Sequence, residues 1–420
     1  MARILIVCDS VPSDQADGLH LRVHNLVAEL TKQHECYLLY CDSEGRVPDY
    51  DGLRFYTEIA TIPPRPVDGR SWKRHFRFSN ANFLRLASPA YLASIDARIS
   101  ELVADWQVDL VASFAAGLGE VGDNLSIPRV LDYTDSRTLT LERMLANPHS
   151  DIPLTTRLQR RLELTRVKGR ERSLVRRHNF TTTISGMDRA ALLRVSGVSG
   201  DRVRVIPNGV SNAAIEAGAG TPATAGRSVA FWGNLDFPPN RTAIRYFFHQ
   251  IFMPFLADGG VEWHIAGRLN DAGLRQELEH PQIRFHGFVD DLFDFVRQHG
   301  VMVNPMVEGS GLKNKILEAF ALGIPVVSTP LGIEAIDCEA GKHYLPGPDS
   351  EAFAGSVLKL LDDATLRSAM SHDARQLVQT RYSWDAVGND YCNFLNSVLA
   401  ATDGAHTKPE PAGELRYESR

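Results

Sequence analysis

The chain contains a series of short runs that are apolar throughout and that alternate with helical patterns. The first run is Arg3–Cys8, and a helical pattern with apolar spacing of three and four follows from Leu19 to Leu30. A second apolar run then occupies Cys36–Cys41. This order of strand, helix and strand is a βαβ unit, and strands that are apolar throughout are buried on both faces, as in parallel sheets. The pattern predicts an α/β fold.

The same alternation continues through both halves of the chain. In the first half, the further strand candidates are Val108–Ser113, Arg129–Asp132, Phe180–Ile184 and Val203–Ile206. In the second half, they are Ser228–Trp232, Val261–Ala266, Ile283–Phe285, Val301–Asn304 and Pro325–Ser328. Helical patterns lie between them, notably Thr242–Phe255 and Leu312–Leu322. The sequence therefore predicts two doubly wound, Rossmann-like domains, in which ligands bind beyond the carboxyl ends of the strands.

Composition divides the chain into four segments. The turn sequence Ile206-Pro-Asn-Gly-Val210 ends the first half, and residues 211–227 are rich in the small and polar residues of a linker. We predict an N-terminal domain at 1–206, a C-terminal domain at 207–380 and a helix at 381–400 that packs back on the N-terminal domain. Residues 401–420 contain few apolar side chains and are expected to be a disordered tail.

Charge and cysteine content exclude several classes of protein. Residues 1–200 hold 26 Lys and Arg against 24 Asp and Glu, and residues 201–420 hold 19 against 27, so neither half has the basic footprint of a nucleic-acid binder. The five cysteines are scattered without a C-x-x-C pair, which indicates reduced thiols rather than disulfides or zinc. No apolar run approaches the roughly 20 residues that span a bilayer, and the first run is too short for a signal peptide. We expect a cytoplasmic protein.

The most informative segment follows the strand candidate Val301–Asn304. A glycine loop, Gly309-Ser-Gly311, opens a helical pattern with Lys313 and Lys315 in its first turn. Backbone amides and the macrodipole make a helix N-terminus an anion site, and a bound phosphate would offset the cost of placing lysines there. Glu318 lies about two turns after the loop, on the same helical face. The segment therefore predicts a phosphate site, with a solvated charged helix as the alternative.

The same segment resembles the donor-site signature of retaining glycosyltransferases of family 4, which have the GT-B fold of two facing Rossmann-like domains. Its second part, Glu318-Ala-Phe-Ala-Leu-Gly-Ile-Pro-Val326, is similar to the family's helix and following strand. Further similar segments are Val205–Val210 at the domain linker and Phe231–Asn240, Ile265–Arg268 and Phe285–Val289 at three strand ends. The resemblance covers roughly residues 1–400 and is stronger in the second half.

The glutamate spacing departs from the family pattern. Family members leave seven residues between a loop glutamate and the helix glutamate, whereas nine residues separate Glu308 from Glu318. When Glu318 is aligned, Ser310 stands in place of the first glutamate. The Gly-Ser-Gly-x-Lys-x-Lys form resembles a sub-branch of bacterial polysaccharide and exosortase-associated sugar transferases, in which a lysine three residues before the helix glutamate is typical; here that lysine is Lys315. Either Glu308 or Ser310 could take the first-glutamate role.

The resemblance implies roles for named residues. The catalytic candidates are Lys315, Arg268, Glu318 and Asp132. The candidates for contact with the nucleotide sugar are Gly18, Gly233, Asn234, Phe288, Glu308, Ser310, Gly311, Leu312, Lys313 and Glu318. The lysines, Arg268 and the loop amides would stabilise the leaving diphosphate. Asp132 and Asp135 would hold the acceptor, unless Asp135 caps the next helix. His20 and Arg22 either face the diphosphate or lie on a solvated helix start.

The implied activity is the transfer of a sugar from a nucleoside diphosphate sugar, with retention of configuration, to a polysaccharide, lipid-linked or other glycoconjugate acceptor. No metal or other cofactor is expected, because there is no Asp-x-Asp near a strand end and Asp290-Asp291 reads as a helix N-cap. Two basic stretches, Arg65–Arg85 and Arg157–Arg177, would suit a peripheral contact with an anionic membrane at the inner face of the cell, or are solvated helix faces.

Three other classes remain as alternatives. A nucleotide-sugar 2-epimerase would have the same two domains and would need no acceptor. A GT-B-like subunit without activity would explain the unusual glutamate spacing. A dinucleotide-binding dehydrogenase is disfavoured because no Gly-x-Gly-x-x-Gly follows the first strand.

Overall fold

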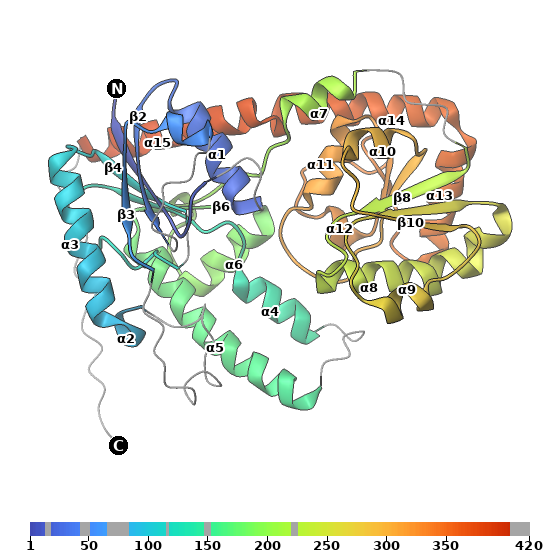
Figure 1. Ribbon diagram of the computed structural model, residues 1–420, viewed down its shortest axis with the longest axis horizontal. Coiled ribbons are helices and arrows are strands. Elements are labelled where there is room, and N and C mark those ends of the chain that lie inside the picture. The colour runs from blue at the N-terminus through green and yellow to red at the C-terminus, as the bar shows by residue number, and fades with distance from the viewer. Residues whose placement is uncertain are drawn as a thin grey trace.

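The structure, a computed structural model, describes residues 1–12, 18–42, 51–64, 84–114, 117–146, 153–219 and 226–403. These residues form two α/β domains, each built on one parallel sheet (Figure 1). The predicted pair of doubly wound domains is confirmed. Most of the basic stretch Arg65–Arg85 and all but three residues of the predicted tail lie outside the described residues.

The N-terminal sheet has seven strands in the order β3-β2-β1-β4-β5-β6-β7. In chain order they are β1 (Arg3–Cys8), β2 (Glu35–Cys41), β3 (Glu58–Ile62), β4 (Leu110–Ser113), β5 (Arg129–Asp132), β6 (Phe180–Thr183) and β7 (Val203–Val205). Central strand β1 is buried on both faces. Ile4 and Ile6 pack toward helices α1 and α15, whereas Leu5 and Val7 pack toward α3. A run that is apolar throughout is stable here because neither face meets water.

Helices cover both faces of this sheet. They are α1 (Gly18–Leu30), η1 (Asp51–Phe55), α2 (Leu84–Ala87), α3 (Pro89–Asp105), α4 (Arg137–Ala146), α5 (Leu154–Arg177), α6 (Gly186–Ser196) and η3 (Gly200–Arg202). Helices α4, α5 and α6 pack on one another, and α4 and α5 extend to the lower side of the N-terminal domain in Figure 1.

The C-terminal sheet has six strands in the order β10-β9-β8-β11-β12-β13. They are β8 (Ser228–Trp232), β9 (Glu262–Ala266), β10 (Ile283–Gly287), β11 (Val301–Asn304), β12 (Val326–Ser328) and β13 (Leu345–Pro346). The helices from the linker onward are α7 (Asn212–Ala217), α8 (Pro238–Tyr246), η4 (Phe247–Leu256), η5 (Ala257–Gly259), α9 (Ala272–Glu277), α10 (Leu292–Arg297), α11 (Asn314–Ala321), α12 (Pro330–Ile333), α13 (Ser350–Asp362), α14 (Ala364–Leu377), η6 (Val378–Tyr382) and α15 (Trp384–Asp403).

The chain crosses between the domains twice, and the two crossings are hydrogen-bonded to each other. The Val210 amide donates to the Tyr382 carbonyl at 2.7 Å, and the Trp384 amide donates to the Val210 carbonyl at 3.2 Å. After the second crossing, α15 packs against α1 and β1 of the N-terminal domain, with Tyr391 and Leu395 fully buried there. The first strand and the last helix of the described chain therefore pack in the same core, that of the N-terminal domain.

Three local expectations differ from the structure. Strands β3 and β13 were not predicted, because Glu58 and Thr61 interrupt the apolar pattern of β3 and β13 has only two residues. The predicted linker 211–227 contains helix α7, whose following residue Gly218 touches the Ala321 carbonyl so closely that a Cβ would lie 1.9 Å from it. The predicted helix at Thr242–Phe255 begins earlier, at Pro238, and widens into a π-helix around Pro254, which lacks an amide hydrogen.

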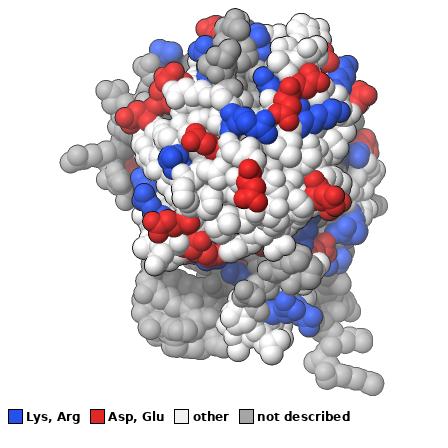
Figure 2. All heavy atoms as spheres, turned by 90° about the vertical axis from the view of Figure 1, so that its right-hand side faces the viewer, with Lys and Arg blue, Asp and Glu red and all other residues white. Residues whose placement is uncertain are grey.

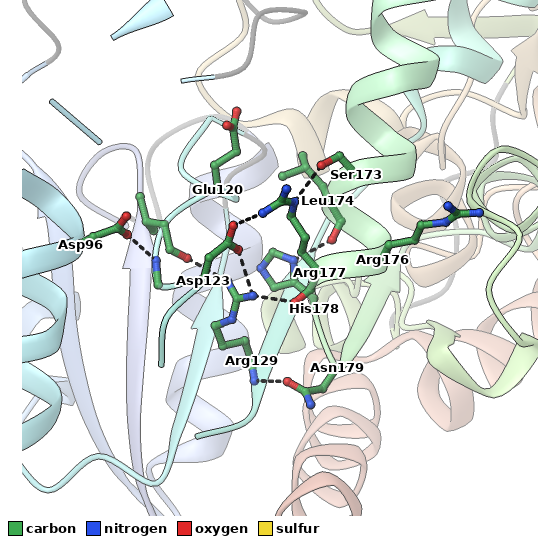
Figure 3. Close-up of polar contacts among 12 residues, drawn as sticks. Asp96, Glu120, Asp123, Arg129, Ser173, Leu174, Arg176, Arg177, His178 and Asn179 are labelled. Atoms are coloured by element: carbon green, nitrogen blue, oxygen red, sulfur yellow. Dashed lines mark hydrogen bonds and ion pairs between the residues drawn. The ribbon is translucent and has the colours of Figure 1, made fainter. Parts of the chain in front are cut away.

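A cluster of ion pairs lies at the amino end of strand β5, opposite the carboxyl end at which ligands bind in such sheets. Asp123 accepts from Arg129 at 3.0 Å and also pairs with Arg177, while Arg129 donates to the Arg177 carbonyl at 2.6 Å (Figure 3). Burial opposes ionisation of Asp123, but the two arginines lower the pKa of its carboxyl below the usual value. This cluster fastens the start of the strand to the end of α5, which is a structural role.

The outer face of the C-terminal domain carries charges of both signs. Lys and Arg alternate with Asp and Glu over a mostly uncharged surface (Figure 2). Bulk charge on that face does not favour one kind of ligand, so the site must depend on a few focused groups.

Candidate active site

The amino-terminal end of α11 presents a set of unsatisfied donors. It follows β11 and the glycine loop, where Gly309 and Gly311 adopt φ of 103° and 71°, a left-handed region that favours glycine. The N-cap residue Lys313 provides no side-chain cap. Among the described residues, the backbone amides from Ser310 to Lys313 donate no hydrogen bond. Free amides at the positive end of a helix are an anion site.

Lys315 lies in the first turn of α11 and points back to the end of strand β8. Its Nζ donates to Asn240 Oδ1 at 2.8 Å and lies 4.0 Å from the centroid of the Phe231 ring. Gly233, with φ of 137°, leaves room for it, since a Cβ there would lie 3.4 Å from Nζ. Burial, with a contribution from Lys313, lowers the pKa of Lys315 to about 7. Its direct contacts are an amide oxygen and a ring, and the charge of Glu318 opposes the fall of its pKa without forming an ion pair among the described residues.

Lys313 holds the glycine loop in shape. Its Nζ donates to the carbonyls of Ser310 at 2.6 Å and Gly311 at 2.9 Å. Burial lowers the pKa of Lys313 to about 8, with Glu334 opposing and Arg143 adding to the shift. The loop thus places two partly dehydrated ammonium groups beside free amides, an arrangement that an incoming diphosphate would stabilise.

Glu318 lies one turn further along α11 and is oriented by a strand residue. Trp232 Nε1 donates to its Oε2 at 2.9 Å. Burial raises the pKa of the Glu318 carboxyl, although the Trp232 hydrogen bond and Lys315 oppose the rise. One carboxylate oxygen is fixed by the indole, and the remaining acceptor capacity can receive a hydroxyl of a ligand.

The two candidates for the first-glutamate role have different neighbours. Glu308 accepts from Thr242 Oγ1 at 2.8 Å, within the C-terminal domain. The Ser310 hydroxyl shares a 2.6 Å hydrogen bond with Thr140 Oγ1 of α4, across the domain boundary. The geometry makes Ser310 part of the domain interface and leaves Glu308 at the side of the loop near α8.

Helix α4 of the N-terminal domain holds the glycine loop from outside. Arg143 donates to the Gly309 carbonyl at 3.2 Å and forms a two-bond pair with Glu334, in which Nη2 and Oε2 are 2.8 Å apart. Neither Thr140 nor Arg143 was a predicted site residue, because no local signal in α4 indicates a partner some 170 residues away. The loop's shape therefore depends on contact between the domains.

The amino end of α1 faces the amino end of α11. A Cβ on Gly18 would lie 3.9 Å from Asn314 Nδ2, and Asn314 Oδ1 accepts from Asn208 at 3.2 Å. His20 is partly buried and hydrogen-bonded to Ser10. Two helix N-termini thus converge from opposite domains, and Gly18 lies where its backbone can approach an anion bound at α11.

Arg22 and Asp132 are not exposed to this cleft. Arg22, 1% exposed, donates to both oxygens of Asp132, with the shortest distance 2.7 Å, and to the carbonyls of Ile206 and Pro207. Thr182 donates to Asp132 at 2.8 Å. The reading of Arg22 as a solvated residue is wrong. Asp132, which the sequence places at the acceptor, has its carboxylate occupied by protein groups, and it fastens β5 to the domain crossing.

The remaining predicted residues lie at strand ends of the C-terminal domain. Arg268 is exposed and its side chain makes no hydrogen bond or ion pair with the described residues. Asn234 is exposed and caps the Asp236 amide at 3.0 Å, while Leu312 is buried with Ile184 from the other domain. Phe288 is 75% exposed after β10. Asp291 caps α10 by accepting from the Asp294 amide at 2.9 Å, which confirms the N-cap interpretation.

Sequence reasoning missed residues that orient the predicted ones. Asn240 accepts a hydrogen bond from Lys315, and Trp232 donates one to Glu318; Asn208 in turn donates to Asn314, which was not predicted either. Asn240 and Trp232 fall inside the Phe231–Asn240 segment, so the family resemblance marked their segment but did not show which side chains they orient.

In the part of the chain that the structure describes, no cluster of three or more His, Cys, Asp or Glu side chains is placed to hold a metal ion. No described helix is long and apolar enough to cross a membrane.

Two family models match, one to each domain. Residues 16–213 match the model described as Glycosyltransferase Family 4, and residues 226–363 match that described as Glycosyl transferases group 1. The N-terminal domain is thus similar to family 4 glycosyltransferases and the C-terminal domain to group 1 glycosyl transferases, and the two facing Rossmann-like domains have the GT-B architecture.

Curated relatives match parts of the chain. The capsular polysaccharide biosynthesis glycosyltransferase CapM of Staphylococcus aureus is 28% identical over 30% of this chain and 33% of its own length. A GDP-mannose-dependent monoacylated alpha-(1-6)-phosphatidylinositol monomannoside mannosyltransferase of Corynebacterium glutamicum is 34% identical over 22% of this chain and 24% of its own length. The chain is thus matched to a third or less of the length of these two relatives.

Solved structures match almost the whole chain at low identity. Anabaena HepE in complex with UDP and glucose superposes with a TM-score of 0.61 at 15% identity, covering 94% of this chain and 100% of its own. Sucrose-phosphate synthase of Thermosynechococcus elongatus superposes with a TM-score of 0.65 at 18% identity, covering 96% and 100%. These similarities show the two-domain fold.

Proposed function

We propose that the protein transfers a sugar from a nucleoside diphosphate sugar to a polysaccharide, lipid-linked or other glycoconjugate acceptor, with retention of configuration. The observation that carries the proposal is the amino end of α11, where Lys313 and Lys315 lie partly dehydrated beside free amides. Such a site stabilises the charge that develops on a leaving diphosphate. The named activities of CapM and the mannosyltransferase, and the UDP bound by HepE, support this class of substrate.

Each side chain then has a task. Lys315 and the Ser310–Lys313 amides bind the diphosphate, Lys313 keeps the loop in shape, and Glu318 accepts a hydrogen bond from a donor hydroxyl. Arg268 is unpaired among the described residues and close in sequence to the Ala266 strand end, so it can move onto the phosphates. Phe288 and the backbone after β10 face the nucleobase, and Glu308 or Ser310 faces the sugar.

Retention follows if the acceptor attacks from the side of the leaving group. The leaving phosphate oxygen then takes the acceptor proton, so the protein needs no separate base. The positive charge of the two lysines replaces the charge that a metal ion would supply, and the proposed reaction uses no metal or other cofactor. Donor and acceptor meet between the domains, where Gly18 and Asp135 lie on the N-terminal side, in a protein that works at the inner face of the cell membrane.

Product analysis tests the proposal. Purified protein is incubated with UDP-, GDP- and ADP-sugars, with and without short glycans and polyprenyl-linked sugars, and nucleotide release is measured together with the anomeric configuration by NMR. We expect release that depends on acceptor and a product with the donor's configuration. Inversion would contradict the retaining mechanism, and a 2-epimer formed from donor alone would identify the epimerase alternative. No turnover in a protein that binds no nucleotide would favour an inactive subunit.

A further inference from the structure

Helix α5 carries a stripe of leucines on its outer face. Leu154, Leu158 and Leu162 are 83%, 61% and 54% exposed and follow one another at intervals of four residues. At about 100° per residue they form one continuous line along the helix. The inner face of the same helix buries Glu163 and Val167. A single exposed leucine needs no explanation. Three aligned leucines on one helix face, however, form an apolar surface that contributes little to the core of the domain and so indicates an interaction site.

The surroundings of this leucine stripe are basic. Residues 153–162 contain Arg157, Arg160 and Arg161 and no carboxylate. The next carboxylate, Glu163, is buried and already paired with Arg137 and Arg160. Arg161 is exposed and lies beside the leucines on the helix surface, whereas Arg160 is paired with Glu163 and the Nε of Arg157 is buried. The stripe is therefore an apolar line bordered by positive charge, which is the composition of helices that lie in the headgroup region of anionic bilayers.

The stripe is one helix away from the candidate active site. In Figure 1 the amino-terminal end of α5 lies at the lower end of the N-terminal domain, with α4 beside it. Helix α4 is fastened to α5 by the Lys168–Glu142 pair at 2.7 Å and the Arg137–Glu163 pair at 3.1 Å. On its other side α4 contacts the glycine loop through Thr140 and Arg143. A bilayer at α5 would thus lie close to the entrance between the domains.

We propose that the leucine stripe of α5 docks the protein on an anionic lipid bilayer, with the leucines in the headgroup region and Arg161 at the lipid phosphates. The link to a lipid-linked acceptor rests on the proposed function, but the docking itself does not. A protein partner fits less well, because three leucines supply little of the ~800 Å² that each side of a standard interface buries. The basic border also favours phosphate over a neutral surface.

Flotation with vesicles tests the proposal on the full chain, without donor. Vesicles of phosphatidylcholine alone and with about a third phosphatidylglycerol are compared at low and high salt. We expect binding to the anionic vesicles that weakens with salt. The double variant Leu158→Gln/Leu162→Gln should bind at least about tenfold less, because apolar burial adds to the electrostatic attraction. The matched control Met253→Gln/Phe255→Gln removes two side chains of the other domain that are 42% and 43% exposed, and should bind like wild type.

Two further readouts separate the possible failures. Nucleotide-sugar stabilisation of the leucine variant should equal that of wild type, so a loss of vesicle binding with normal donor binding supports docking, whatever the transfer reaction proves to be. Equal flotation of wild type and the leucine variant, or none by wild type, would overturn the proposal. A dimer in light scattering that the leucine variant loses would assign the stripe to a second copy of the chain and also overturn it.

Discussion

Two buried cations lie at facing ends of the two sheets, and they differ in what surrounds them. Arg22, in the N-terminal domain, is paired with both oxygens of Asp132 and with two carbonyls. Lys315, in the C-terminal domain, directly contacts an amide oxygen and an aromatic ring, and the pKa of its ammonium group falls to about 7 although the charge of Glu318 opposes the fall. A buried cation with a complete set of partners fastens structure, whereas one with neutral partners is ready to receive an anion.

The largest expected effect is on stability, in the N-terminal domain. Asp132→Ala leaves the Arg22 guanidinium buried without its counter-charge, which typically costs about 3–5 kcal/mol. Thermal and urea unfolding should show this loss. The double variant Arg22→Met/Asp132→Leu removes both charges and should recover much of it. If Asp132→Ala instead unfolded like wild type and lost only transfer activity, the pair would be catalytic and the contrast between the domains would disappear.

The next effect is on catalysis, in the C-terminal domain. Lys315→Met should lower kcat/KM by about 10²–10³, the range seen when a preorganised donor to a developing negative charge is removed. The unfolding midpoint should stay the same or rise, because a dehydrated ammonium group is lost. Lys342→Met, at an exposed lysine of the same domain, is the control and should change neither quantity. Unchanged turnover in a folded Lys315→Met protein would refute its role.

A smaller effect is expected where the two domains meet. Arg143→Ala leaves Glu334 without its partner and frees the Gly309 carbonyl, so the glycine loop should lose its shape and donor affinity should fall by roughly 1–3 kcal/mol. Calorimetric titration with the donor measures it. Arg194→Ala, which breaks an exposed pair with Glu142, is a matched control with an expected effect of about 0–1 kcal/mol on stability and none on donor affinity. Equal donor affinity in wild type and Arg143→Ala would show that the loop keeps its shape without α4.

The mildest perturbation is a change of pH. In the free protein Lys315 and Lys313 lose their protons near pH 7 and pH 8, and a bound diphosphate favours the protonated forms. Donor binding should therefore take up protons above pH 7, and the Kd for a nucleotide sugar should rise on the order of tenfold or more between pH 6.5 and 8.5. A nucleotide sugar is the right probe because its diphosphate does not titrate in this range.

The same two lysines predict the opposite slope for stability. In the unfolded chain their pKa is about 10.4, so the unfolded state binds more protons between pH 7 and 10, and their contribution makes the free protein more stable as pH rises. Wild type compared with Lys315→Met isolates this contribution. A donor affinity that is flat across the range, or that improves with pH, would show that the lysines are not titrating at the donor site.

The sequence predicted those parts of the fold that depend on local patterns. Nearly every central strand was visible because burial on both faces demands an unbroken apolar run, as in β1 and β8. The edge strands β3 and β13 were missed for local reasons: Glu58 and Thr61 interrupt the apolar pattern of β3, and β13 has only two residues. The helix inside the linker was missed because its small residues pack closely on α11 and so have the composition of a loop.

The candidate site was predictable where a motif carried it and hidden where contact depends on the tertiary fold. The glycine loop and both lysines follow from one continuous segment. That Asn240 would hold Lys315, or that Arg143 would reach Gly309, depends on how separate elements come together. Asp132 was assigned to the acceptor because it ends a strand, but the sequence could not show that Arg22 and Thr182 occupy its carboxylate.

Thermal stabilisation by nucleotide sugars, measured on wild type and Lys315→Met without added metal, tests the central claim most directly. A ligand present at 100 times its Kd stabilises the folded state by about 2.7 kcal/mol, which is readily measured. The account predicts that one series among UDP-, GDP- and ADP-sugars stabilises wild type and that Lys315→Met loses most of that shift. No shift with any donor in folded wild type, or an equal shift in the variant, would contradict the assignment of the amino end of α11 as the diphosphate site.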